Sequence, residues 1–420
     1  MSPCLMGKRR NAVASWLPNV TGPVRDAVLC IYNLENLSQL IISSYQSVIE
    51  MIFQIVSQRM CLRSSAAKSG RSEYLSKYHA RQRSRNVWPN TRDYEIIHRY
   101  YDQWPTGIAV AADGIMFSNY PPGQDLNNSA YTIAELNSNN TETPYPNAEI
   151  NSPPGGSINY TTVLPIGAHY QDCLIGVQTV TIDPANRLWI LDTGRAATPD
   201  GTMVPASYGA PKLIGVNLSN NSIFTTIVFS PTAAPADSYL NDVRFDLNPD
   251  LTPSGQGIAY ITDSSMEGGN ALVIVDIGAK TAWRPLINNL PYLPHRDLSQ
   301  PFGERLFTRT WAMGMPMGNL NFGVDGIALS ADAHTLFFST TGGRELYSVP
   351  TANLRDDGAT SEQKANGAVT YLGSLGLSDA METDSNNNIY RGDMEDNSIG
   401  IFNWNIQSRY WSLQYLCERS

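Results

Sequence analysis

Apolar residues alternate with polar or small residues in five short segments of this chain, and a tight-turn sequence follows most of them. In the clearest copy, residues 323–339 (GVDGIALSADAHTLFFS), two alternating runs flank the turn sequence Ala-Asp-Ala-His. Alternation with a period of two residues, closed by a polar turn, predicts a β-hairpin. The other copies begin at Pro105, Val177, Leu240 and Ser378. Recurrence of one hairpin at domain-scale intervals predicts an all-β fold of stacked sheets.

Alignment of the five copies by their apolar residues places one polar residue at the same position of each. These residues are Thr106, Gln178, Asn241, Asp325 and Asp379. Their intervals of 72, 63, 84 and 54 residues exceed the roughly 40–45 residues of a bare propeller blade, so some loops between strands must be long. The inner strands of a β-propeller line a central channel. We therefore expect this polar set, with Asp242 beside Asn241, to bind a ligand at one channel mouth. The alternative is that each residue caps its own strand by bonding to nearby backbone.

The composition and the charge narrow the class of protein. Aromatic residues at 10%, charged residues at 16%, and many glycines and prolines suit an all-β domain of the secreted type. No apolar run approaches the roughly 18 residues needed to span a bilayer. Residues 1–86 carry 12 Lys/Arg against 4 Asp/Glu, whereas residues 87–420 carry 17 against 34. An acidic body repels phosphate backbones, which excludes nucleic acid as a partner and favours a cationic or neutral small ligand, or a metal.

The first 86 residues share nothing with the repeat and are expected to form a separate segment. Apolar spacing between Leu40 and Val56 predicts an amphipathic helix near residues 37–57. The basic, Ser-rich remainder is typical of a disordered tract, or alternatively of a transit peptide or a segment that binds anionic surfaces. No signal-peptide pattern is visible in residues 1–30. The propeller is expected to occupy residues 87–420, with order beginning near Val87 to Tyr94.

The sequons and the cysteines provide information on whether the protein is secreted. Five Asn-x-Ser/Thr sequons fall in polar stretches of the body and predict a secreted glycoprotein. They are Asn127, Asn139, Asn159, Asn217 and Asn220. The five cysteines are scattered and form neither a disulfide framework nor a metal-binding spacing. Within the body, Cys173 and Cys417 could form one bridge.

Several longer strings of the body resemble the major royal jelly protein/Yellow family, most closely its fungal members. They are residues 104–110 (WPTGIAV), 177–180 (VQTV), 183–195 (DPANRLWILDTGR), 239–246 (YLNDVRFD), 259–264 (AYITDS), 344–350 (RELYSVP) and 378–384 (SDAMETD). The resemblance implies a six-bladed β-propeller that acts outside the cell. Members of that family bind small molecules, serve as nutritive proteins or take part in pigment formation.

One departure from the family concerns the end of the chain. After the copy at Asp379, a member of the family would continue into one more repeat of the inner hairpin. Residues 401–405 (IFNWN) are instead followed by unrelated residues as far as Ser420. We therefore expect a six-bladed design with an incomplete last blade, which would expose strand edges.

The polar set is also similar to the site of gluconolactonase-type propellers, which hold a divalent metal. By that resemblance Asp325, Asp379 and the carbonyl of Asn241 would bind Ca²⁺ or Mg²⁺, both of which prefer oxygen ligands. That family has a Glu at the position of Thr106, and a threonine hydroxyl is a weaker metal ligand than a carboxylate. With a metal bound, a polarised carbonyl and an activated water would hydrolyse a lactone, with Asp379 or Asp242 as the base.

Without a metal, two carboxylates that face one cavity would repel and the pKa of one would rise. They would then serve as anchors for an amine. Nearby aromatic residues would add cation–π contacts, or alternatively belong only to the core: Tyr239, Trp311 and Phe322.

The leading hypothesis is a secreted propeller that binds a small cationic or aromatic ligand at the channel mouth. One alternative is an enzyme, either a metal-dependent lactone hydrolase or an isomerase of a pigment pathway. A second alternative is a nutritive or interaction protein with no active site. The sequence leaves open whether the chain is an enzyme and which oligomer it forms.

Overall fold

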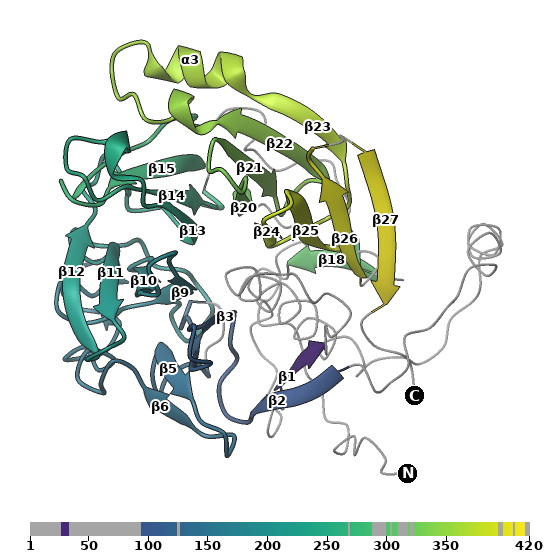
Figure 1. The fold of residues 1–420 in the computed structure, drawn as a ribbon. Coiled ribbons are helices and arrows are strands. Elements are labelled where there is room, and N and C mark those ends of the chain that lie inside the picture. The colour runs from purple at the N-terminus through teal and green to yellow at the C-terminus, as the bar shows by residue number, and fades with distance from the viewer. Residues whose placement is uncertain are drawn as a thin grey trace, which may run out of the picture.

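The computed structural model describes ten stretches of the chain. They are residues 27–32, 94–123, 127–267, 269–287, 300–302, 305–309, 318–319, 323–393, 398–405 and 408–415. Within them the protein is a β-propeller in which sheets are arranged around a central axis (Figure 1). The only α-helix in these stretches is α3 (Ser361–Ala368), at the periphery. The all-β fold class is confirmed.

Five four-stranded antiparallel sheets form the blades, each with its first strand innermost. Blade 1 contains β3 (Gly107–Val110), β4 (Met116–Asn119), β5 (Ile133–Leu136) and β6 (Glu142–Pro144). Blade 2 contains β9 (Val177–Ile182), β10 (Leu188–Asp192), β11 (Lys212–Asn217) and β12 (Ser222–Val228). Blade 3 contains β13 (Leu240–Asp246), β14 (Ile258–Asp263), β15 (Ala271–Asp276) and β16 (Thr281–Trp283).

The chain then builds two more blades. Blade 4 contains β20 (Val324–Leu329), β21 (Thr335–Thr340), β22 (Glu345–Pro350) and β23 (Thr370–Ser374). Blade 5 contains β24 (Met381–Thr383), β25 (Asn388–Asp393), β26 (Ser398–Asn403) and β27 (Ser408–Tyr415). Smaller sheets are made by β7 (Ile158–Asn159) with β8 (Ile166–Gly167), and by β17 (Gln300–Phe302), β18 (Arg305–Arg309) and β19 (Gly318–Asn319). Short 3₁₀ turns occur at η3 (Pro249–Leu251) and η5 (Thr351–Asn353).

The described residues contain five such blades, whereas the sequence led us to expect six with the last incomplete. Strand β2 (Tyr94–Tyr100) lies in the remaining part of the ring, between blades 1 and 5 (Figure 1). Tyr100 packs there with Ile108 and Tyr120 against the open face of blade 1. Within the described residues, β2 therefore contributes to the cover of the apolar face of blade 1.

Part of the expected N-terminal segment is a strand. Strand β1 (Ala27–Tyr32) pairs antiparallel with β2, although the sequence predicted no strand before residue 87. The helix expected near residues 37–57 lies outside the described residues, as does Cys417, while Cys173 is a free thiol. No helix in the described stretches is long and apolar enough to cross a membrane.

Acidic residues fix several of the turns between the first two strands of a blade, as the turn at Asp183 illustrates. Its carboxylate accepts hydrogen bonds from the backbone N–H groups of Ala185 and Arg187, at 2.9 and 3.0 Å, and from the indole N–H of Trp189 at 2.8 Å. Asn186 adopts φ 56°, a left-handed conformation that Asn tolerates in tight turns. Asp183 therefore joins the β9–β10 turn to the blade core, where Trp189 stacks on Phe245 of blade 3.

A fully buried ion pair fixes the start of blade 2. The Lys212 ammonium lies 3.0 Å from the Asp192 carboxylate, and neither side chain reaches solvent. Asp192 also accepts hydrogen bonds from the backbone N–H groups of Ile175 and Gly176. Lys212 donates to the carbonyl oxygens of Tyr170 and Ala210. The ion pair and these hydrogen bonds therefore compensate the burial of both charges, and removal of either side chain would leave the other charge buried without its partner.

Lys212→Met is expected to destabilise the protein by about 3–5 kcal/mol, because it leaves a carboxylate buried without its cation. Urea unfolding followed by tryptophan fluorescence measures the change. Lys364→Met is the matched control, since Lys364 pairs with Asp356 at 2.9 Å on the exposed surface, where such pairs contribute little. Equal midpoints for the two variants would contradict the assigned role of Lys212.

Candidate functional site

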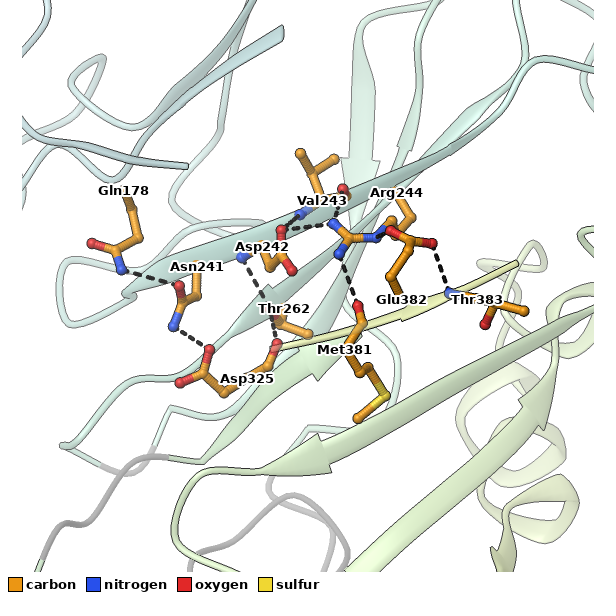
Figure 2. A network of polar contacts seen from close by, with 10 residues as sticks. All are labelled: Gln178, Asn241, Asp242, Val243, Arg244, Thr262, Asp325, Met381, Glu382 and Thr383. Carbon is orange, nitrogen blue, oxygen red and sulfur yellow. Dashed lines mark hydrogen bonds and ion pairs between the residues drawn. The ribbon is translucent and has the colours of Figure 1, made fainter. Parts of the chain in front are cut away.

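The five polar residues at the starts of the inner strands lie in one connected cluster. Thr106 Oγ1 donates to the backbone oxygen of Gln178 at 3.3 Å. Gln178 Nε2 donates to Asn241 Oδ1 at 3.1 Å, and Asn241 Nδ2 in turn donates to the carboxylate of Asp325 (Figure 2). These bonds connect blades 1, 2, 3 and 4. The structure thus brings the predicted residues together, while their role in binding stays a prediction.

Asp379 joins the cluster through a threonine. Thr341, directly after β21, donates from Oγ1 to Asp325 Oδ2 at 2.6 Å, and the same oxygen lies 3.5 Å from Asp379 Oδ1. The side chains of Asp325 and Asp379 also share a hydrogen bond. Asp325 is only 5% exposed. Two carboxyl groups therefore meet in a largely buried position at the boundary of blades 4 and 5.

The electrostatics of this pair favour a bound proton. Burial, followed by the negative charge of Asp379, raises the pKa of Asp325 well above its usual range. Burial also raises the pKa of Asp379 to about 6, against the hydrogen bond from Asp325, which lowers it. In the described part of the chain, no Lys, Arg or His contacts either carboxyl group. The pair is expected to share one proton near neutral pH, as closely placed carboxyl groups do.

Asp242, the sixth predicted site residue, points into a different network. It accepts a hydrogen bond from Arg244 Nη1 at 2.8 Å, and Arg244 Nε lies 2.8 Å from the Glu382 carboxylate. Arg244 Nη2 also donates to the backbone oxygen of Met381 at 3.0 Å (Figure 2). Burial raises the pKa of Asp242 and the Arg244 charge opposes that rise. Asp242 is therefore held in an ion pair with Arg244, while its negative charge contributes to the raised pKa of both Asp325 and Asp379.

Sequence reasoning missed a second tier of polar residues at the ends of the second strands. Asn119 Nδ2 donates to Thr106 Oγ1 at 2.8 Å, and Asn241 Nδ2 donates to Ser264 Oγ at 3.0 Å. Thr341 is the member of this tier that bridges the carboxyl pair. Because the second strand of a hairpin is antiparallel, its end lies beside the start of the first. A search for polar residues at both places would have found them.

The aromatic candidates have different outcomes. Tyr239 is buried, and its hydroxyl donates to Gln178 Oε1 at 2.8 Å, so it orients one of the predicted site residues. Trp311 and Phe322 lie outside the described residues. Tyr239 is therefore the aromatic residue that the structure joins to the cluster.

The predicted metal ligands do not fit Ca²⁺ or Mg²⁺. Asn241 turns its amide nitrogen, not its oxygen, toward Asp325, and its oxygen accepts from Gln178. That leaves two carboxyl groups where Ca²⁺ takes six to eight oxygen ligands. The described residues contain no group of three or more His, Cys, Asp or Glu side chains placed to hold a metal. The arrangement is better suited to protons and hydrogen-bonded cations.

Asp379→Asn is expected to change how stability depends on pH. The pKa of Asp379 in the folded protein is raised to about 6. Protonated Asp379 therefore stabilises the folded state fully below about pH 4, and this stabilisation is lost as the pH rises through 6. The variant cannot ionise at this position. Between pH 4.5 and 7.5 its free energy of unfolding should therefore fall less than that of the wild type, by roughly 1–3 kcal/mol. Urea unfolding across that range measures it. Asp332→Asn is the control, since Asp332 lies in an exposed turn and its pKa is lowered. Parallel profiles for wild type and Asp379→Asn would refute the assignment.

Comparison with known proteins places these features in a family. The profile of the family described as Major royal jelly protein matches residues 175–415, more than half of the chain. The Yellow-related salivary protein M10 of Phlebotomus duboscqi is 27% identical over 235 residues, which cover 54% of this chain and 52% of that protein. Major royal jelly protein 5 of Apis mellifera is 26% identical over 245 residues, covering 56% of this chain and 36% of that protein. The chain thus matches about half of the first relative and about a third of the second.

Solved structures resemble the chain more distantly. A gluconolactonase from Xanthomonas campestris has 13% sequence identity and a TM-score of 0.38, with 72% of this chain and 74% of that chain covered. A likeness at that level carries no argument about activity. The family profile and the relatives agree with the strings that first pointed to this assignment. The chain belongs to the major royal jelly protein family, which includes the Yellow-related proteins.

Proposed function

We propose that this protein binds a small cationic ligand outside the cell, with Asp325 and Asp379 as the anchor for its charge. The observation that carries the proposal is the buried carboxyl pair, which contacts no cationic side chain in the described part of the chain. The acidic balance of residues 87–420 favours the approach of a cation. The names of the relatives, a salivary and a royal jelly protein, support an extracellular location.

The surrounding residues suit an ammonium group. Each oxygen of Asp325 accepts one hydrogen bond, from Asn241 or from Thr341, and a carboxylate oxygen can accept a second. Among the described residues, Asp379 accepts from Asp325 and, at 3.5 Å, from Thr341. An ammonium with three N–H donors can therefore bond both carboxylates at once. Thr106, Gln178 and Asn241 fix the positions of these groups through the chain of bonds described above.

The proposal includes a division of the chain into two parts. Residues 87–420 would act as the propeller unit, in a six-bladed design whose last blade is incomplete and includes β2. Residues 1–86 would form a separate segment. The site would then depend on blades 3, 4 and 5, which supply Asn241, Asp325 and Asp379.

A second candidate function is an acid–base isomerase. The pKa of Asp379, raised to about 6, lies close to neutral pH, where a carboxyl group can both give and take a proton. Such a pair could move a proton between two atoms of a ligand bound beside it. A metal-dependent lactone hydrolase is less well supported, because Asn241 and Thr106 are engaged in bonds inside the protein. A nutritive protein would have no use for a buried carboxyl pair.

The binding proposal predicts that benzylammonium, used as a probe, binds the wild type and that neutral benzyl alcohol does not. Asp325→Asn and Asp379→Asn should each weaken benzylammonium binding at least tenfold, since each removes one charge from a largely buried site. Affinity should be higher at pH 7.5 than at pH 5.5, because the cation needs ionised carboxylates. Isothermal calorimetry measures all of these.

Asp332→Asn is the matched control, because it removes one charge from an exposed turn of the same blade. Absence of benzylammonium binding, or binding that none of the substitutions changes, would rule out the carboxyl pair as the anchor. Binding of Ca²⁺ that both substitutions abolish would instead support the metal hypothesis.

A further inference from the structure

Exposed apolar side chains of the described residues gather beside two sequons. Ten large apolar side chains are exposed in that part of the chain, and five of them lie in two short segments. They are Tyr160, Val163 and Leu164 on the β7–β8 hairpin, and Ile223 and Phe224 at the start of β12. Each group follows a sequon asparagine within five residues, Asn159 in the first case and Asn220 in the second.

The β7–β8 hairpin holds its apolar tip in the solvent. Val163 is fully exposed and Leu164 is 75% exposed. Asn159 Oδ1 accepts hydrogen bonds from Thr161 N at 2.9 Å and Thr161 Oγ1 at 2.6 Å, and Thr162 Oγ1 donates to the carbonyl of Leu164 at 2.6 Å. These bonds order the turn with its apolar side chains outward. Exposed apolar surface that is held in this way marks a place where something covers it.

Strand β12 presents the second group at the outer edge of blade 2. It is the outermost strand of its sheet, with the sequence SIFTTIV, which contains no charge and no proline. Such an edge is a template for unwanted strand pairing unless it is protected. Asn220 is exposed at the turn that leads into β12, and its Oδ1 accepts from Ser222 N at 3.1 Å and Ser222 Oγ at 2.7 Å. Arg187 lies over one face of the Phe224 ring and Lys280 donates to the carbonyl of Thr226, yet Ile223 and Phe224 stay partly exposed. The strand begins two residues after a sequon asparagine.

We propose that Asn159 and Asn220 carry N-linked glycans and that these glycans cover the adjacent apolar side chains. The inference rests on the extracellular location in the proposed function and is independent of the ligand. In the described part of the chain, Nδ2 of neither asparagine makes a hydrogen bond. Each nitrogen would form a bond to the anomeric carbon of an oligosaccharide whose donor is a polyprenyl pyrophosphate. The polyprenyl pyrophosphate would leave with the electrons of the broken C–O bond, and the amide would lose one proton.

The charges near the hairpin favour a sugar over a lipid surface. No Lys or Arg occurs between Arg99 and Arg187, so the hairpin itself carries no cation for an anionic headgroup. The acidic body would itself be repelled by such a surface. A glycan is uncharged in its core, bulky and solubilising, and it would be attached within the turn that presents the apolar tip. The nearby sequon thus identifies the covering group.

The test is to direct the full chain into the secretory pathway of yeast with a cleavable leader. Glycan sites are then identified by mass spectrometry after enzymatic release in ¹⁸O-labelled water. Protein retained in the cells is analysed in the same way, because glycans are added before secretion. We expect Asn159 and Asn220 to be occupied in most molecules. An unoccupied Asn159 or Asn220 overturns the proposal.

Asn159→Gln and Asn220→Gln test the covering role. Each should raise the fluorescence of an apolar dye severalfold and lower the concentration at which the protein aggregates. Asn139→Gln is the matched control, since Asn139 has the same turn geometry, with Thr141 Oγ1 donating to Oδ1 at 2.7 Å, and no exposed large apolar neighbour. Replacing Val163 and Leu164 with Thr in the Asn159→Gln variant should reverse its effect.

Two results would contradict the covering role. One is dye binding and aggregation that do not change when either glycan is lost. The other is measurable binding of the glycosylated wild type to phosphatidylcholine vesicles, equal to that of Asn159→Gln. That result would make the hairpin a lipid-binding loop. Benzylammonium binding, measured on the same samples, tests the ligand proposal separately, since its loss would leave the glycan result unaffected.

Discussion

The guanidinium group of Arg244 joins two blades that are not neighbours in the ring, and the geometry of the candidate site depends on that connection. Arg244 belongs to β13 of blade 3, yet it bonds to Glu382 and to the carbonyl of Met381 in blade 5. Met381 lies two residues after Asp379. Since Met381 is the first residue of β24 and Asp379 lies only two residues before it, the bond that holds Met381 also limits how far Asp379 can move from Asp325.

Buried ion networks of this kind are weak evidence for stability, because desolvation of the charges offsets much of their attraction. What such a network supplies is a defined arrangement of its groups. Arg244 is buried and is shared between Asp242 and Glu382, so neither carboxylate needs a second cation. Among the described residues, the carboxyl pair of Asp325 and Asp379 is left without a cation. A location where local chemistry conflicts with stability is where function is expected.

The sequence predicted the inner part of each blade well and the outer part poorly. Alternation followed by a turn revealed the hairpins that begin at β3, β9, β13, β20 and β24, because those strands are buried and their turns require Asp, Asn or Gly. The number of complete blades was not predictable in the same way, since Tyr100 of β2 covers blade 1 through contacts that no local pattern encodes. The partner of Arg244 was equally hidden, because it lies 138 residues away and only the closed ring brings the two together.

The contacts within the cluster bear on the choice between strand caps and a shared pocket, residue by residue. Thr106 and Asn119 bond to the backbone oxygen of Gln178, which is what a cap does, and Gln178 and Asn241 are satisfied by neighbouring side chains. Capping accounts for these residues without any ligand. It accounts for the two hydrogen bonds that the oxygens of Asp325 accept, from Asn241 and Thr341, but not for a second carboxyl group buried beside them at Asp379, because burial of that charge is unfavourable. The two aspartates are therefore the members of the set whose chemistry the fold alone does not require, and the amides and hydroxyls around them act by holding that pair in place.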